Sequence, residues 1–390
     1  HRNLDFANNL WPAASGDDGS YATDYSYNAN GSIVSLKRNG PAGVSLDMDD
    51  MTYVYENVTN GYARNTNKLR QITDVVPSNT YTDDMDNQAA DNFDYDEIGN
   101  LIKNDFECIQ DIEWTVYGKV KKLTRIPGCT TEGTAMPDLE FKYDANGNLT
   151  AKIVKPDGTT NPDNPSEWET TYYVHDASGN NFTSYKQKPV SEGGEFILEQ
   201  QQLYGSSHTG TFKPNLDLTN PPAPGNTFSR TLGLKSYFLG DHRSNHNVTV
   251  SDRKIPVEDV GNPGTIENFE PDIVRVVDYF PFGREQNARI FNKDESDFGY
   301  NGKLNIQEWS SRLGGAQLYG FRIKYGEGFL SVDPLTGSYP MFTPYQYASN
   351  SPIINIDVDG AEGTNILSNF IPKSWYPVVK ISDGDGFGDI

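Results

Sequence analysis

Residues 141–149 read Phe141-Lys142-Tyr143-Asp144-Ala145-Asn146-Gly147-Asn148-Leu149, and this short stretch decides the fold. Phe141 and Tyr143 alternate with Lys142, so a strand would carry both rings on one face. Asp or Asn followed by Gly predicts a turn, because these residues tolerate positive φ and the short polar side chain bonds back to the backbone. Apolar residues then alternate again from Leu149, as in a returning strand. The stretch therefore predicts one antiparallel β-hairpin.

The same pattern recurs through the first half of the chain. Close copies occupy residues 25–33 and 93–101, a looser copy occupies 173–180, and variants occupy 52–69 and 112–120. One hairpin cannot bury its aromatic face alone, so successive copies are expected to stack, with their rings in the core. A sugar-binding platform is the alternative use of these tyrosines. Aromatic residues make up 12% of the sequence, with 36 Gly and 23 Pro, which suits short strands and tight turns and favours an all-β fold.

Charge and length exclude several classes of protein. The 390 residues carry a formal net charge of −22, which repels nucleic acid, and no basic cluster offsets it. No apolar run approaches the roughly 20 residues that span a bilayer, so we expect a chain that does not span membranes. Acidity of this size is typical of secreted or cell-surface proteins. The chain opens HRNLDFANNL, without a starting Met or signal peptide, and we interpret it as a piece of a longer protein.

The two cysteines, Cys108 and Cys129, lie 21 residues apart in consecutive predicted strand–turn units. A single bridge and two free thiols both remain open, and an extracellular setting favours the bridge.

A second informative stretch runs from Phe329 to Gly360, FLSVDPLTGSYPMFTPYQYASNSPIINIDVDG. Acidic clusters at Asp333 and at residues 357–359 bracket a segment rich in Tyr and Pro. Its prolines bar a long helix, because each removes a backbone donor and pushes the preceding residue towards extended geometry. The acidic ends therefore lie on extended or turning backbone, where a fold could bring their carboxylates together.

Residues 300–360 resemble the RHS-repeat-associated core domain of Rhs and YD-repeat proteins. The phrases that carry this resemblance are Tyr300-Asn301-Gly302-Lys303, Tyr319-Gly320-Phe321-Arg322 and Ile356-Asp357-Val358-Asp359-Gly360, with residues 237–242 and 278–283 upstream. The hairpin pattern matches the YD repeat of the same family. The resemblance implies a spiralling antiparallel β-sheet, or partial shell, closed by a core plug. The expected divisions are 1–185 repeat hairpins, 186–235 irregular insertion or linker, 236–300 further repeat strands, 301–360 RHS-associated core and 361–390 C-terminal tail.

The resemblance also implies a site. In this family, aspartates of the core segment are thought to cut the chain's own backbone just after the second motif and to free a C-terminal toxin. Carried over, these residues are Asp333 with Asp357 or Asp359, and Arg322 is the neighbouring cation. Two close carboxyl groups cannot both ionise cheaply, so one acts as acid and the other as base. The alternative is structural, since Asp-Pro and Asp-Gly are ordinary turn formers.

The acidic tail suggests one metal site. Asp383, Asp385 and Asp389 could supply hard oxygen ligands for Ca²⁺, and an acidic end without a ligand is the alternative. We expect no other cofactor.

Three functions follow from these patterns. The first is a non-catalytic shell segment of a larger secreted or surface bacterial protein that encloses or displays a C-terminal cargo. Its expected partners are the remainder of the same polypeptide, or a shell or secretion protein, and the cargo itself. The second is a self-cleaving aspartic protease that releases a toxin. The third is a surface adhesin that binds glycans.

Overall fold

The chain is all-β, as the sequence predicts. The computed structural model describes residues 19–42, 45–59, 63–78, 80–81, 85–131, 133–156, 164–221, 231–292, 297–310, 315–361 and 363–365, and these contain no α-helix. The strands are β1 (Thr23–Tyr27), β2 (Ile33–Asn39), β3 (Asp47–Thr59), β4 (Ala63–Asp74), β5 (Phe93–Tyr95), β6 (Leu101–Asn104), β7 (Ile109–Trp114), β8 (Val120–Arg125), β9 (Thr130–Thr131), β10 (Thr134–Ala135), β11 (Asp138–Tyr143), β12 (Leu149–Lys155), β13 (Glu169–His175), β14 (Asn181–Gln187), β15 (Phe196–Tyr204), β16 (His208–Phe212), β17 (Leu216–Asp217), β18 (Lys235–Gly240), β19 (His246–Glu258), β20 (Ile266–Tyr279), β21 (Glu285–Asn292), β22 (Leu304–Ile306), β23 (Ala316–Leu318), β24 (Ile323–Tyr325), β25 (Gly328–Phe329), β26 (Asn355–Asp357) and β27 (Gly363–Asn365). Single 3₁₀ turns are η1 (Asp105–Glu107), η2 (Pro165–Glu167), η3 (Val190–Glu192), η4 (Pro281–Gly283), η5 (Tyr300–Gly302), η6 (Gln307–Trp309) and η7 (Ala348–Asn350).

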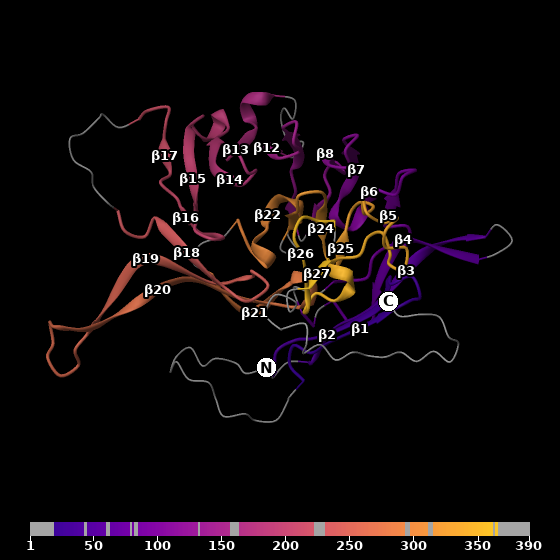
Figure 1. Cartoon of the computed structure of the whole chain (residues 1–390), viewed down its shortest axis with the longest axis horizontal. Helices are drawn as coiled ribbons and strands as arrows, with labels where there is room; N and C mark the ends of the chain where they lie inside the picture. The colour runs from indigo at the N-terminus through magenta and orange to yellow at the C-terminus, as the bar shows by residue number, and fades with distance from the viewer. Residues whose placement is uncertain are drawn as a thin grey trace, which may run out of the picture.

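One long antiparallel sheet forms most of the molecule. It has 15 strands in the order β21-β20-β19-β18-β16-β15-β14-β13-β12-β11-β8-β7-β6-β5, with β17 paired to β15. Almost every strand pairs with the next strand in sequence, which is the arrangement that a run of hairpins predicts. A second sheet, β1-β2-β3-β4, adjoins β5, and the two sheets curve around strands β22–β27 (Figure 1). We call β1–β21 the wall, and residues 297–361 the plug.

The repeat turn is built differently from the sequence expectation. Asp144 N–H donates to Asn148 O at 3.0 Å, and Asp144 Oδ1 accepts from the N–H groups of Asn146 and Asn148 at 2.8 and 2.9 Å. Gly147 alone takes a positive φ, +83°, and Asn146 does not. This is a type I turn followed by a glycine bulge, in which Asp is the acceptor and Gly the left-handed residue. The same bonding recurs at residues 96–100, 176–180 and 241–245.

The predicted irregular linker at 186–235 is wrong over much of its length. Strands β15 and β16 lie within it and continue the sheet between β14 and β18. Gly205 and Pro214 in this region lie between short strands, and Gly and Pro also predict loops when they are read from the sequence alone. Residues 222–230 lie outside the described residues. Residues 254–271 form a two-stranded ribbon that extends β19 and β20 away from the rest of the sheet (Figure 1).

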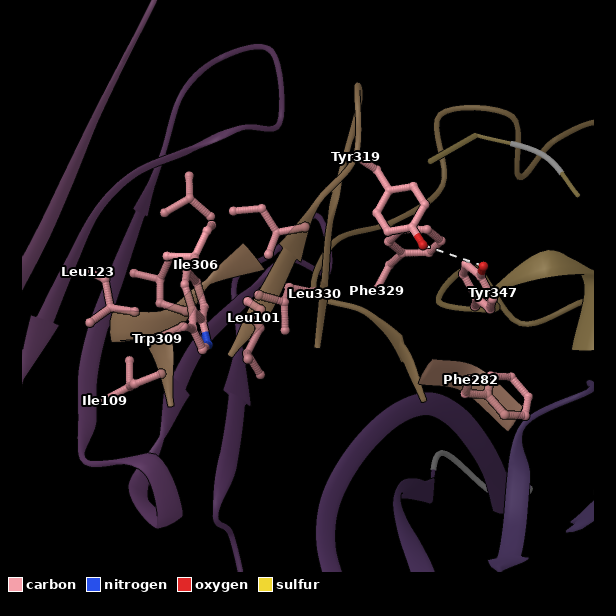
Figure 2. Close-up of a cluster of buried hydrophobic side chains, with 14 of the residues drawn as sticks. Leu101, Ile109, Leu123, Phe282, Ile306, Trp309, Tyr319, Phe329, Leu330 and Tyr347 are labelled. Atoms are coloured by element: carbon pink, nitrogen blue, oxygen red, sulfur yellow. Dashed lines mark hydrogen bonds between the residues drawn. The ribbon is translucent and has the colours of Figure 1, made fainter. Parts of the chain in front are cut away.

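The rings of the repeats pack both against the plug and against other rings of the wall. Tyr95 meets Tyr345 of the plug with 5.7 Å between ring centroids, whereas Tyr25 meets Phe282 of the wall at 5.1 Å. Tyr185 stacks on Phe196, also within the wall, at 5.7 Å. The buried cluster joins the two layers, with Leu101, Ile109 and Leu123 from the wall facing Ile306, Trp309 and Leu330 from the plug (Figure 2). The predicted aromatic core is therefore present, and its two halves come from distant parts of the sequence.

Cys108 and Cys129 form a disulfide, with their Cα atoms 5.8 Å apart. The bond closes a loop between the start of β7 and the turn after β8. It settles the alternative that the sequence left open.

Candidate functional site

The plug brings three of the predicted site residues together around the Arg322 guanidinium. Arg322 comes directly before β24 and is buried, with its charged group 3.8 Å from the centroid of the Phe329 ring. Its Nη2 donates to Asp333 Oδ2 at 2.9 Å and lies 3.9 Å from Asp357 Oδ2. Burial lowers the pKa of Arg322 to about 10, against the opposing attraction of Asp333, and leaves the group charged at neutral pH.

Asp333 is a buried turn residue that also holds the cation. Its Oδ1 accepts from Leu335 N–H at 2.7 Å, while its Oδ2 takes the bond from Arg322. Its backbone N–H donates to Pro344 O at 2.9 Å, and Arg322 Nη1 reaches the same carbonyl at 3.1 Å. Both proposed uses of Asp333, turn former and charge partner, are therefore visible in its contacts.

Asp357 differs from Asp333 because one of its oxygens has no hydrogen-bond partner among the described residues. Oδ1 accepts from Gly360 N–H at 2.6 Å, and the buried Oδ2 accepts no hydrogen bond. Burial raises the pKa of Asp357 to about 6, and the bond from Gly360 and the charge on Arg322 only partly oppose it. The carboxyl group is thus close to half protonated near pH 6.

The backbone after Asp357 is held at three successive carbonyls. Lys303 Nζ donates to Val358 O, Phe321 N–H donates to Asp359 O at 2.7 Å, and Arg322 Nε donates to Gly360 O. Asp359 does not join the buried pair, because it is only half-buried and its Oδ1 accepts from Ala361 N–H at 3.1 Å.

The arrangement is a charge clamp more than an aspartic dyad. In a dyad the two carboxyl groups share a proton directly. Here the Arg322 guanidinium contacts both Asp333 and Asp357 and ties them to two backbone carbonyls. The cluster can fix the path of the chain at 357–361. It also places Asp357, an acid of raised pKa, beside the Asp359–Gly360 peptide, whose carbonyl already accepts a hydrogen bond.

Sequence reasoning missed Lys303. Its ammonium group contacts the 357–361 backbone from the opposite end of the plug, and burial lowers its pKa. The residue stands in the Asn-Gly-Lys phrase that helped carry the family resemblance, but a lone lysine in sequence gives no sign of what it contacts.

The calcium prediction at Asp383, Asp385 and Asp389 falls outside the described residues. Within the part of the chain that the structure describes, no group of three His, Cys, Asp or Glu side chains could hold a metal ion. The same residues contain no helix of the length and apolarity that crossing a bilayer requires.

Comparison with known proteins does not assign this chain to a family, because no family model matches it. A curated relative is Salivary gland surface protein 1 of Aedes aegypti, which is 27% identical over 273 residues. The match covers 68% of this chain and 6% of that protein.

Among solved structures the chain is similar to Tc toxin components. The crystal structure of TcdB2-TccC3 without the hypervariable C-terminal region is 13% identical, with a TM-score of 0.43 over 87% of this chain and 18% of that chain. The Tc holotoxin pore of Photorhabdus luminescens is 13% identical, with a TM-score of 0.35 over 88% of this chain and 18% of that chain. The likeness is coarse. This chain spans less than a fifth of the matched chain in either structure.

Proposed function

We propose that this chain is a structural shell segment of a larger secreted or surface protein, in which the plug anchors the polypeptide that follows it. The observation that carries the proposal is the buried cluster that the plug shares with the wall, to which the plug contributes Ile306, Trp309 and Leu330 among others. These plug residues fill the interior between the strands of the wall.

Arg125 of the wall shows how firmly the plug is attached. Its guanidinium donates to Glu107 O at 2.7 Å within the wall, and to Glu308 O and Trp309 O of the plug at 2.8 Å each. Lys152 adds an ion pair to Glu308 at 2.6 Å. Each of these bonds gives a buried or half-buried polar group its partner. Without the plug, several of these groups would lose that partner.

The repeat turns also hold the plug. Tyr345 Oη donates to Gly99 O at 2.6 Å, and Asn350 Nδ2 donates to Gly31 O at 2.7 Å. Both carbonyls belong to the bulge glycines of the repeat turn. Two repeat turns thus bind the plug in the same way, which supports a role in holding a C-terminal segment.

The exit of the chain supports display or enclosure of a cargo. Gly360 and Ala361 are buried, so the polypeptide that follows the second motif starts from a buried position. The remainder of the polypeptide, or a shell partner, would complete the enclosure. The disulfide supports a secreted or cell-surface location, since such bonds persist in oxidising compartments.

Attachment of the plug can be tested without removing it. A site for a sequence-specific protease inserted between Asn292, the last residue of β21, and Asp297, the first residue of the plug, would cut the chain between wall and plug. We expect the two fragments to co-elute in native gel filtration and to separate only in denaturant. Separation in native buffer would refute the structural role, and the uncut protein treated with the same protease is the control.

Self-cleavage is the second candidate, and Asp357 is the observation that favours it. A buried acid whose pKa lies near 6 contacts the Gly360 N–H, while Phe321 N–H polarises the carbonyl of the same Asp359–Gly360 peptide. Water would add to that carbonyl carbon as Asp333 or Asp357 accepts its proton, and the nitrogen would leave protonated.

Intact mass separates the two candidates. The structural role predicts an unbroken chain in the wild type, Asp333→Asn and Asp357→Asn alike. Self-cleavage predicts a break near Gly360 that only the wild type shows.

A further inference from the structure

A cavity separate from the Arg322 cluster lies between the wall and the plug. Its volume is about 130 Å³, and strands β3, β4 and β5 close one side while residues 325–330 and 343–346 of the plug close the other. Its lining includes the apolar and aromatic side chains of Tyr53, Tyr55, Ile72, Phe93, Leu330 and Tyr345, together with polar side chains such as those of Ser32, Gln88 and Gln346. The space is partly open to solvent, which lets a small molecule enter it from outside.

The polar groups of the lining are engaged with the protein itself. Tyr55 Oη donates to Ile33 O at 2.7 Å, and Tyr345 Oη donates to Gly99 O at 2.6 Å. Tyr53 Oη donates to Glu327 at 3.1 Å, and burial keeps the pKa of Tyr53 well above its usual range, so its hydroxyl stays protonated. A bound water needs two to four polar partners, and these hydroxyls have little to offer one.

Glu327 is the charged residue in the lining. Its Oε1 pairs with Arg38 at 3.3 Å, and its side chain is 10% exposed. The Glu327 carboxylate can accept a hydrogen bond from one donor group of a ligand, and its negative charge repels an anionic ligand. Gly326 beside it widens the space, because a Cβ at that position would meet no atom within 4 Å.

We propose that this cavity binds a compact, uncharged aromatic molecule of benzene to indole size. A cavity of about 150 Å³ lined by Leu, Ile and Phe is known to take up benzene, and the volume and the aromatic part of the lining here match this class of ligand. The rings of Tyr53, Phe93 and Tyr345 would contact the ligand, and Glu327 would accept from an N–H such as that of indole. Aromatic anions are excluded by Glu327 and by the overall negative charge.

Titration of the whole protein with indole, benzene and indole-3-carboxylate tests the proposal. We expect saturable binding of indole and benzene by calorimetry, with a rise in melting temperature that grows with ligand concentration. Indole-3-carboxylate should bind at least tenfold more weakly than indole. Absence of saturable binding by both neutral probes would overturn the proposal, and so would equal binding of the anion.

A matched pair of variants locates the site. Ile72→Phe fills the cavity and should weaken indole binding at least tenfold, whereas Ile98→Phe makes the same change at an exposed turn and should alter it less than twofold. Methyl-labelled spectra of the wild type provide a second measurement that needs no variant. Indole should shift the methyl signals of Ile72 and Leu330 and leave that of Ile98 in place. Shifts elsewhere without these two would place the ligand outside the cavity and refute the proposal.

Discussion

Replacing Asp357 with Asn should stabilise the protein at neutral pH, although it removes a buried carboxylate that faces an arginine. The reason is that burial outweighs attraction at this position. Oδ2 of Asp357 lies 3.9 Å from Arg322 and has no hydrogen-bond partner among the described residues. Asn keeps the oxygen that accepts from Gly360 N–H and carries no charge.

The magnitude follows from the pKa. The pKa of Asp357 rises from 3.8 to about 6 on folding. Because the folded state holds its proton more tightly than the unfolded state, stability falls as pH rises from about 4 to about 6 and stays low above that range. The shift corresponds to about 3 kcal/mol at about 1.4 kcal/mol per pKa unit. An amide N–H left without an acceptor costs about 1 kcal/mol of this, for a net gain of about 2 kcal/mol.

Thermal unfolding at a series of pH values measures the effect. With an unfolding entropy of about 2 cal/mol/K per residue, the gain at pH 8 corresponds to a rise of about 2–3 °C in melting temperature, and it should vanish near pH 4. Asp333→Asn is the control with the opposite sign. It removes the acceptor 2.9 Å from Arg322 and should cost about 3–5 kcal/mol, because it leaves a buried guanidinium short of a partner. A lower melting temperature for Asp357→Asn at pH 8, or a gain that does not change with pH, would refute the reasoning.

Three further predictions concern the wall. Gly118→Ala should lower the free energy of unfolding by about 1–2 kcal/mol. Gly118 has φ +72° and a Cβ there meets no atom within 4 Å, so backbone strain alone causes the loss. Urea unfolding measures the loss, and Gly118→Asn should recover part of it. Thiol titration of the unreduced protein should find no free cysteine, and two titratable thiols would contradict the disulfide. Replacing both Cys108 and Cys129 with Ser should lower the free energy of unfolding by about 3 kcal/mol for a loop of this length. Burial lowers the pKa of His208 to about 4 and of His246 to about 3, so stability should be lost as pH falls from about 6.5 through these values, since the unfolded chain binds the protons first. His246→Gln should reduce that acid sensitivity, and an unchanged pH profile would exclude His246 as its source.

The sequence predicts the wall well because each hairpin is a local structure. The alternation of Phe141 and Tyr143 and the position of Gly147 suffice for strand, turn and strand. The hydrogen bonding inside the turn was harder to predict. The Asn-Gly pair marks the turn in the sequence, but the acceptor is Asp144, three residues before Gly147.

Long-range packing explains the rest of the differences. The meeting of Arg322, Asp333 and Asp357 was expected from the resemblance, whereas the contact of Lys303 with Val358 O depends on how the two ends of the plug come together. Strands β15 and β16 were not predicted, for a related reason. Their pairing depends on neighbouring strands of the sheet, whereas the turn residues at their ends predict a loop.

The position of Arg125 has a consequence for biosynthesis. Its partners Glu308 and Trp309 lie 183 and 184 residues further along the chain. While a ribosome is still making the intervening strands, the aromatic side of the earlier hairpins has nothing to cover it. Contacts of such long sequence separation form late and slowly. The nascent protein should therefore depend on chaperones until its last fifth emerges, and truncation before that point should yield aggregates in place of a smaller folded unit.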